Sequence, residues 1–416
     1  MRFGRAAGVA TLGLALAVSA CGGGDGAAGS GGEEKVTLAY AIWDNNQKAV
    51  MEELGREFTR THPNITINVQ VTPWTDYWTK LKAAVSGGAA PDVFWMNGPN
   101  FQLYAANGVI SPNPEQVDTS VYPKALVDLY TYEGKLYGLP KDMDTIGVWY
   151  NKELFDAANV KYPADDWTWA DFQETAAKLT DPGKGVYGVA ASLASFQEYQ
   201  YNTIAQAGGY VISPDGTKSG YADPKTIEGL RFWTRLIERK HSPDLKTMTD
   251  TTPIDLFKAG KTAMYWGGSW AVADFAGHPG TKDVVDVAPL PKGERQATII
   301  HGVSNVVSAK TEHPRQAWEF VKFLGSRQAA DILGKKGPIP AYHGTQQAWV
   351  DAHPEYKLQV FLDAVDYAVP YPVSKNTAAW NEAELTHLSK AWSGEQPVEQ
   401  AAAELARTMD ALLAKE

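Results

Sequence analysis

Two acidic residues of this chain are spaced so that they could do chemistry together. Asp142 and Asp144 form an Asp-x-Asp pair, and on an extended segment both carboxylates would share one face. Such a pair could hold a divalent metal with a nucleotide-sugar, as in some glycosyltransferases. Alternatively, two carboxylates about 5–10 Å apart could flank a glycosidic bond. The pattern is short and acids are abundant, so the sequence leaves a glycosidase open without favouring it.

The motifs of better-defined reactions are incomplete or missing. Residues 267–271 (GGSWA) depart from the G-x-S-x-G nucleophile elbow at the last position. The sequence contains no H-E-x-x-H motif, no Walker A loop and no EF-hand loop. Its single cysteine, Cys21, excludes an intramolecular disulfide framework and any multi-cysteine metal site. These features favour a binding protein over an enzyme, and we expect no metal and no cofactor.

The first 34 residues have the features of an export signal followed by a tether. Arg2 and Arg5 precede an apolar run over 6–18 that is too short to span a bilayer but suits a secretory signal. Residues 18–21 (VSAC) resemble the lipobox of bacterial lipoproteins, in which the cysteine carries the lipid. A plain secretory signal with an incidental cysteine is the alternative. We therefore expect a signal peptide over 1–20 and, over 21–34, a lipidated Cys21 with a glycine-rich flexible tether. The protein would be extracytoplasmic and anchored to the cell membrane.

Composition and charge narrow the class of the remaining chain. The whole chain has 416 residues, 44% of them hydrophobic and 21% charged, which is ordinary for a globular protein of two or three domains. With 38 basic and 48 acidic residues the net charge is −10, which argues against nucleic-acid binding.

Strands and helices are expected to alternate along the chain. The segments 36–42, 65–71 and 91–96 read as strands, with helices over 47–61 and 76–86 between them. This alternation predicts βαβ units and a mostly parallel sheet. Two α/β blocks follow in series, over about 35–140 and 145–296. The last stretch, 298–416, begins with a strand and ends in helices.

Short motifs spread along the chain point to one family. They are 86–93 (SGGAAPDV), 134–140 (GKLYGLP), 149–155 (WYNKELF), 168–169 (TW), 260–264 (GKTAM), 267–270 (GGSW) and 317–324 (AWEFVKFL). In their order and spacing, and with the lipobox, the chain resembles the extracellular solute-binding proteins of bacterial ABC importers. Within that class it is similar to the carbohydrate-binding family that includes maltose- and trehalose-type binders. The resemblance covers most of the mature chain.

The resemblance implies an α/β fold of two lobes with a hinge between them and a helical C-terminal part. It places 35–141 and 298–342 in the N-terminal lobe, and 142–297 and 343–416 in the C-terminal lobe. It further implies that a carbohydrate is held in the interlobe cleft and delivered to permease subunits in the membrane, whose ATPase lies in the cytoplasm. We expect a monomer.

The residues that should touch the ligand follow from a rule for open α/β sheets, in which ligands bind beyond the carboxyl ends of strands. Aromatic rings can cover the C–H faces of a pyranose, while Asp and Asn side chains bond its hydroxyls. The candidates of these types at expected strand ends, at the hinge and in the C-terminal part are Trp43, Asp44, Asn45, Trp95, Asn97, Asp142, Asp144, Trp266, Ser269, Trp270, His301, Tyr371 and Trp380.

Most candidates also have a structural interpretation. Trp266 lies within a strand, where a core position is favoured, and Trp380 could be helix core. Asp44 could cap the following helix, and Tyr371 could be a rigid loop residue between two prolines. His301 stands where family members often have Gly. Another polyol-like solute, such as a glycerophosphodiester, stays open as ligand, although a buried phosphate usually requires Arg or a helix N-terminus.

Overall fold

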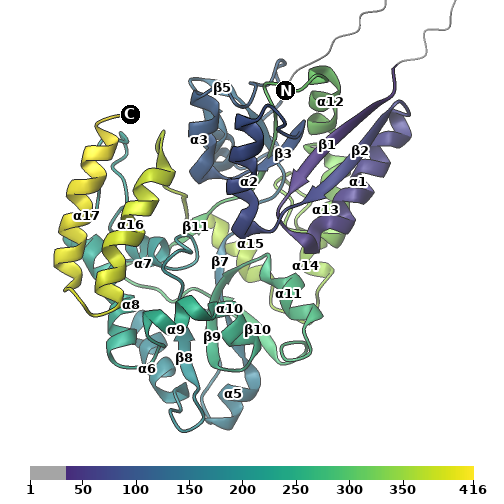
Figure 1. Cartoon of the computed structure of the whole chain (residues 1–416). Helices are drawn as coiled ribbons and strands as arrows, with labels where there is room; N and C mark the ends of the chain where they lie inside the picture. Colours follow the sequence, from purple (N-terminus) through teal and green to yellow (C-terminus); the bar gives the residue numbers. More distant parts are fainter. Residues whose placement is uncertain (1–33) are drawn as a thin grey trace, which may run out of the picture. The chain divides into compact units, whose positions relative to one another are not determined.

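The computed structural model describes residues 34–416, whose strands gather into two main sheets (Figure 1). Cys21, the signal segment 1–20 and the tether up to residue 33 lie outside these residues, so the expectations for them stay predictions. Within residues 34–416, no helix combines the length and the apolar character that crossing a membrane requires.

The first sheet joins segments that are far apart in the sequence. Its strand order is β2-β1-β3-β12-β6. The strands are β1 (Val36–Ile42), β2 (Ile65–Val71), β3 (Val93–Met96), β6 (Gly138–Pro140) and β12 (Ser304–Val307). Strand β1 runs parallel to β2 and β3, whereas β12 lies antiparallel between β3 and β6. A late strand therefore completes a sheet that the chain began at residue 36.

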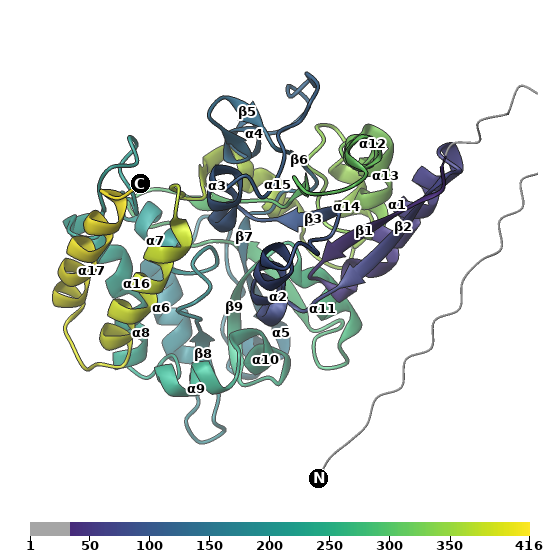
Figure 2. The ribbon, with the colours of Figure 1, turned by 45° about the horizontal axis from the view of Figure 1, so that its top comes forward.

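Helices cover both faces of the first sheet because its side chains alternate between two cores. On β3, Val93 and Trp95 join one core, while Phe94 and Met96 join the other. The first core is closed by α1 (Lys48–Thr61), α12 (Pro314–Leu324) and α13 (Arg327–Lys336). The second is closed by α2 (Trp74–Ser86), α3 (Gly98–Ala106) and α4 (Lys124–Leu129). Figures 1 and 2 show α12 and α13 beside α1 despite their distance in sequence.

The second sheet has the order β10-β7-β9-β8. Its strands are β7 (Ile146–Asn151), β8 (Tyr187–Ala190), β9 (Thr262–Gly268) and β10 (Val285–Pro289). Strand β7 is antiparallel to both β9 and β10, and only β8 and β9 are parallel. The predicted parallel βαβ arrangement is confirmed for β1, β2 and β3, but the prediction of a mostly parallel sheet is wrong for each sheet as a whole. The chain enters β7 and β12 after it has left the other main sheet, and not through a helical crossover within the same sheet. These two strands therefore run antiparallel to their neighbours.

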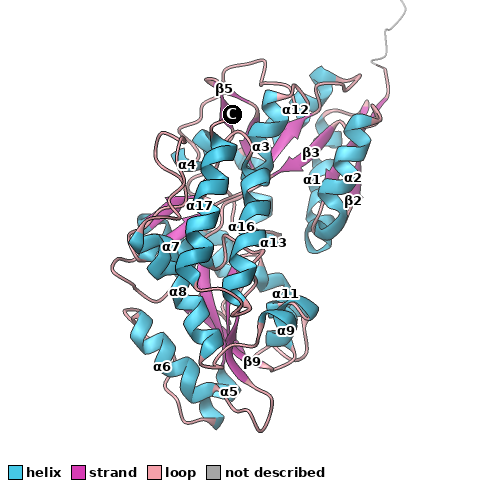
Figure 3. Cartoon of the chain, turned by 60° about the vertical axis from the view of Figure 1, so that its left-hand side comes forward, coloured by secondary structure: helices cyan, strands magenta, loops and turns pink. Residues whose placement is uncertain are grey.

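Helices surround the second sheet and make up most of the C-terminal part. Those before β11 are α5 (Lys152–Ala157), α6 (Trp169–Leu179), α7 (Gln200–Gln206), α8 (Pro224–Glu238), α9 (Leu245–Asp250), α10 (Pro253–Lys258) and α11 (Ala271–Gly277). The later ones are α14 (Gln347–Asp351), α15 (Gln359–Asp363), α16 (Thr377–Trp392) and α17 (Val398–Leu413). Helices α16 and α17 run side by side and pack on α8, and α16 also contacts α3 (Figure 3).

Short elements complete the fold. A hairpin pairs β4 (Thr131–Tyr132) with β5 (Lys135–Leu136), and β11 (Thr298–Ile300) pairs in parallel with β13 (Ala368–Pro370). Two short 3-10 helices are η1 (Asn45–Gln47) and η2 (Ala364–Tyr367). The hairpin turn is formed by Glu133 and Gly134, and both residues adopt positive φ angles.

Three segments run between the two sheets and bond to one another. The backbone N–H of Lys141 donates to the Val303 oxygen at 2.8 Å, and that of Asp144 donates to the His301 oxygen at 2.8 Å. The N–H of Met143 donates to the oxygen of Ile339 at 3.0 Å. The chain thus crosses between the sheets in a bundle of hydrogen-bonded segments. The exact boundaries predicted for the two lobes remain predictions.

Candidate ligand-binding site

A cavity of about 770 Å³ lies between elements of the two sheets. Its volume is within the ~300–1,000 Å³ typical of small-molecule sites. The first sheet contributes the segments that follow β1 and β3, and the second contributes the turn that follows β9. The crossing residues 142–144 and one face of α16 complete the lining. Strand ends of both sheets therefore open into the same space.

Most of the candidates chosen from the sequence line this one cavity. They are Trp43, Asp44, Trp95, Asn97, Asp142, Asp144, Ser269, Trp270, His301 and Tyr371. Asp44 also accepts a hydrogen bond from the backbone N–H of Asn46 at 2.8 Å. It therefore caps the 3-10 helix η1 and lines the cavity at the same time. Asn97 likewise lines the cavity and caps α3.

Three candidates do not line the cavity, for different physical reasons. Asn45 is exposed at the start of η1, and its neighbours Asn46 and Gln47 face the cavity instead. Trp266 is fully buried in the middle of β9, where its ring packs 4.9 Å from that of Trp233. Trp380 is fully buried on α16, and its Nε1 donates to the Ser374 hydroxyl at 2.8 Å.

Several residues that line the cavity were not predicted from the sequence. Trp74 and Trp78 stand one turn apart on α2, which begins just after β2 ends. The loop 192–199 follows β8 and contributes Gln197 and Glu198 among others. Both segments come after a strand, so the strand-end rule would have pointed to them had it been applied to β2 and β8. By contrast, Asn381 carries no such signal, because its place depends on which face of α16 meets the cavity.

Tryptophans form the wall of the cavity on the side of the first sheet. The Trp43 ring centroid lies 5.0 Å from that of Trp95, 5.4 Å from that of Trp74 and 6.0 Å from that of Trp78. Trp74 keeps 51% of its surface exposed although it packs against Trp43. Contact between the rings holds them in place, so their free faces are available to a ligand without further ordering.

Trp270 faces the cavity from the second sheet. It follows β9 at the start of α11, and it is only partly buried. A side chain at Gly268 would collide with the Trp270 ring, so the glycine lets the ring lie back over the strand end. The turn therefore fixes where this aromatic face stands.

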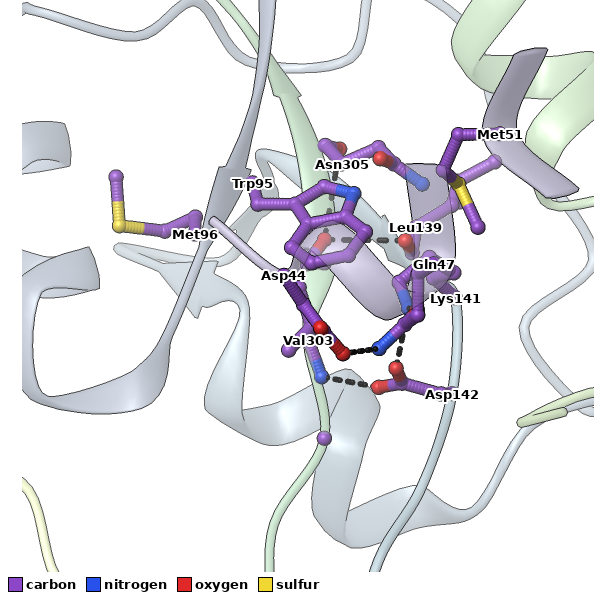
Figure 4. A network of polar contacts seen from close by, with 12 residues as sticks. Asp44, Gln47, Met51, Trp95, Met96, Leu139, Lys141, Asp142, Val303 and Asn305 are labelled. Atoms are coloured by element: carbon purple, nitrogen blue, oxygen red, sulfur yellow. Dashed lines mark hydrogen bonds and ion pairs between the residues drawn. The ribbon is translucent and has the colours of Figure 1, made fainter. Parts of the chain in front are cut away.

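A buried ion pair holds the floor of the cavity together (Figure 4). The Lys141 ammonium is fully buried, pairs with the Asp142 carboxylate and donates to Gln47 Oε1 at 2.9 Å. It also lies 4.3 Å from the centroid of the Trp95 ring. The other oxygen of Asp142 accepts from the backbone N–H of Val303 at 2.6 Å. The buried Lys141 ammonium thus fixes three lining residues, Gln47, Trp95 and Asp142.

Burial changes the protonation of other groups on the floor. It raises the pKa of Asp144 to about 8, with the nearby Asp142 charge as the second cause. Burial likewise raises the pKa of Glu198, whose carboxylate accepts from the Tyr265 hydroxyl at 2.7 Å. The pKa of His301 is lowered to about 4 by burial, and its Nε2 accepts from the Gly98 N–H at 3.0 Å. At neutral pH, His301 is uncharged and Asp144 is mostly protonated.

The cavity combines apolar faces with hydrogen-bonding groups and lacks exposed positive charge. Its acids are Asp44, Asp142, Asp144, Glu198, Asp274 and Glu382, and none of the described lining residues is Lys or Arg. Within residues 34–416, no cluster of three or more His, Cys, Asp and Glu side chains could hold a metal. This arrangement suits a neutral ligand with many hydroxyls and some apolar surface.

Comparisons with known proteins agree with this geometry. A sequence profile of the bacterial extracellular solute-binding protein family matches residues 43–331. An ABC substrate-binding protein of Listeria monocytogenes, solved with cycloalternan, is 28% identical, has a TM-score of 0.85, and is matched over 92% of this chain and 100% of that one. The GacH receptor of Streptomyces glaucescens is 24% identical with a TM-score of 0.80, over 92% and 99% of the two chains.

Sequence comparison also identifies a relative whose ligand is named. The maltotriose-binding protein of Pyrococcus abyssi is 28% identical over 299 residues, which are 68% of this chain and 61% of that protein.

The different surroundings of two tryptophans predict different costs of removal. Trp266→Ala should lower the free energy of unfolding by ~3–5 kcal/mol, because it empties a fully buried ring site between Phe172 and Trp233. Trp74→Ala, at a half-exposed ring, should cost far less. Urea unfolding of both variants measures the difference. Equal losses in the two would contradict the assignment of Trp266 to the core.

Proposed function

Because the chain belongs to the family of bacterial extracellular solute-binding proteins, we propose that it captures a sugar for an ABC importer. The ligand is held in the cavity between the two lobes and is an oligosaccharide. Binding closes the lobes around it, a population shift driven by the ligand's better fit to the closed form. The closed form delivers the sugar to permease subunits in the membrane, whose ATPase lies in the cytoplasm.

One observation carries this proposal: aromatic faces from both lobes border a cavity whose remaining lining is largely polar. Trp43, Trp74 and Trp78 stand on one lobe and Trp270 on the other. Pyranose rings offer apolar faces to such side chains and hydroxyls to carboxyl and amide groups. The several rings on one wall support a ligand of more than one sugar unit. The maltotriose-binding relative supports the same ligand class.

The two alternative functions fit the cavity less well. A glycerophosphodiester carries a negative charge, whereas the described lining has six acids and no Lys or Arg, and the Lys141 ammonium is buried against Trp95. A glycosidase requires a free acid and a free carboxylate. Asp142 has one oxygen on Lys141 and the other on the Val303 N–H, which suits a fixed binding group better than a nucleophile. We therefore propose binding without catalysis.

A ligand screen tests the proposal directly. Thermal shift should show stabilisation by an oligosaccharide such as maltotriose, because a ligand that binds only the folded state adds ~2.7 kcal/mol at a hundredfold excess over Kd. Calorimetry on the best ligand should then show Trp270→Ala at least ~30-fold weaker, the usual cost of an aromatic anchor. The ligand-free melting temperature of this variant should move only slightly.

Tyr210→Ala removes an exposed aromatic ring that does not line the cavity and should leave affinity unchanged. Sugar recovered after binding should be intact, and steady cleavage lost on mutation of a cleft carboxyl would indicate a glycosidase. Stabilisation by glycerophosphocholine with none by any sugar would overturn the proposed ligand class.

We also propose that the mature protein is a monomer anchored through a lipid on Cys21. The support is the VSAC sequence at 18–21, the glycine-rich stretch after it and the extracellular character of the family. One acyl chain alone holds a protein only marginally, so stable anchoring needs the two or three chains of a bacterial lipoprotein. The tether would leave the lobes free to reach the permease.

Cys21→Ala tests the anchor. The variant should appear in the soluble fraction or accumulate with its signal uncleaved, since the modified thiol is gone. Membrane fractionation with mass spectrometry of the N-terminus measures both. A Cys21→Ala protein that is processed and still fractionates with membranes as the wild type does would show that the anchor lies elsewhere.

A further inference from the structure

Glu384 is a buried carboxylate that is hydrogen-bonded to a residue lining the cavity. It lies on α16 with no exposed surface, rotated about a third of a turn around the helix from the lining residues Ala378 and Leu385. It does not line the cavity itself, but Asn381, one turn earlier on the helix, does. No ion pair to Glu384 is found among residues 34–416. A buried carboxylate without a cation is costly unless hydrogen bonds satisfy it.

Hydrogen-bond donors from three segments satisfy this carboxylate. The Tyr201 hydroxyl of α7 lies 2.9 Å from Oε2, and the Tyr221 hydroxyl donates to Oε1. The Asn381 amide nitrogen donates to Oε2 at 2.7 Å. Because an ionised carboxylate only accepts hydrogen bonds, it dictates that the nitrogen end of the Asn381 amide turns toward it.

The consequence for Asn381 is that both of its amide hydrogens are used inside the protein. Besides Glu384, the amide nitrogen donates to the Tyr201 hydroxyl at 2.9 Å. No hydrogen bond to Asn381 Oδ1 is found in the described chain, and this oxygen is not among the buried unpaired atoms. Asn381 therefore presents an oxygen, and no N–H, to the cavity.

We propose that Glu384 is a positioning residue that fixes the Asn381 amide, so that this side of the site accepts a hydrogen bond from the ligand and cannot donate one. The proposal rests on the proposed function, because the ligand group that it selects is a sugar hydroxyl. A free hydroxyl at that position can donate to Asn381 Oδ1. A methyl ether there can only accept, so it leaves Oδ1 unpaired and is rejected.

Protonation of Glu384 should release this arrangement. Burial raises the pKa of Glu384 to about 7. The titratable groups that face it are Tyr201, Tyr221 and Tyr371, whose pKa values are all raised, so none of these tyrosines ionises near neutrality. A protonated Glu384 donates one hydrogen bond and accepts fewer, so the Asn381 amide loses its fixed orientation. Affinity should therefore fall as the pH drops through about 7.

A double-mutant cycle separates positioning from general packing. With the ligand found by the screen, calorimetry at pH 8.5 should show Glu384→Gln and Asn381→Ala each ~10-fold weaker, the worth of one hydrogen bond. Their combination should be no weaker than Asn381→Ala alone, because Glu384 acts through Asn381. Additive losses, or an unchanged affinity of Glu384→Gln, would overturn the proposal.

The matched control is Asp286→Asn. Asp286 is another buried carboxyl that accepts a tyrosine hydroxyl, that of Tyr150 at 3.3 Å, but it does not line the cavity. Its variant should lose stability and keep full affinity. The fall in wild-type affinity between pH 8.5 and 6 should also be reduced in Glu384→Gln. Asp144 titrates in the same range and is common to both proteins, so an identical pH profile would contradict the role of Glu384.

A measurement without any ligand keeps this test independent of the proposed function. In ligand-free protein labelled with ¹⁵N-asparagine, the Asn381 side-chain amide, identified by its loss in Asn381→Ala, should titrate with a midpoint near pH 7. A failed sugar screen would then refute the ligand class and leave the positioning role standing. An Asn381 amide that is insensitive to pH from 6 to 8.5 would refute the positioning role.

Discussion

The hydrogen bonding between the segments that cross from one sheet to the other is the constraint on which the rest of the structure depends. Buried backbone groups need partners, and crossing segments have no sheet of their own to supply them. Asp144 and His301 solve this by exchanging two backbone hydrogen bonds, of 2.8 and 3.1 Å. Side chains satisfy other backbone groups here, because Asp142 accepts from the Val303 N–H and His301 from the Gly98 N–H, and both residues line the cavity with Asp144. The same few residues are where a hinge would change its dihedral angles.

The floor of the cavity is held by charge and its walls by aromatic packing, and these serve different purposes. Lys141 is buried between Trp95 and Asp142, so its charge is committed to holding lining residues in place. Burial leaves Asp144 and His301 without full charge at neutral pH, which suits a neutral ligand. The walls belong to different lobes, with Trp43 on one and Trp270 on the other. A ligand that spans the cavity can therefore contact both lobes.

Much of this site could be predicted from the sequence because strand ends can be recognised locally. The rule that ligands bind beyond strand ends led to Trp43, Trp95 and Trp270, and the same rule at β2 and β8 would have added Trp74 and the loop 192–199. The helix α16 shows the limit of local patterns. Which of its faces meets the cavity depends on its packing against α8, α17 and α3. The sequence therefore could not show that Trp380 is buried whereas the next residue, Asn381, lines the cavity. Antiparallel pairing of β12 with β3 and β6 joins segments too far apart for any local signal.

The central claim is that a sugar draws the two lobes together across a hinge made by the crossing segments. Small-angle X-ray scattering of the protein, with and without a saturating oligosaccharide from the screen, tests it most directly. The radius of gyration should be smaller with the sugar, and it should not change with a sugar that calorimetry shows not to bind. An unchanged radius at full saturation would contradict capture by closure and would place the sugar on a site that does not span the two lobes.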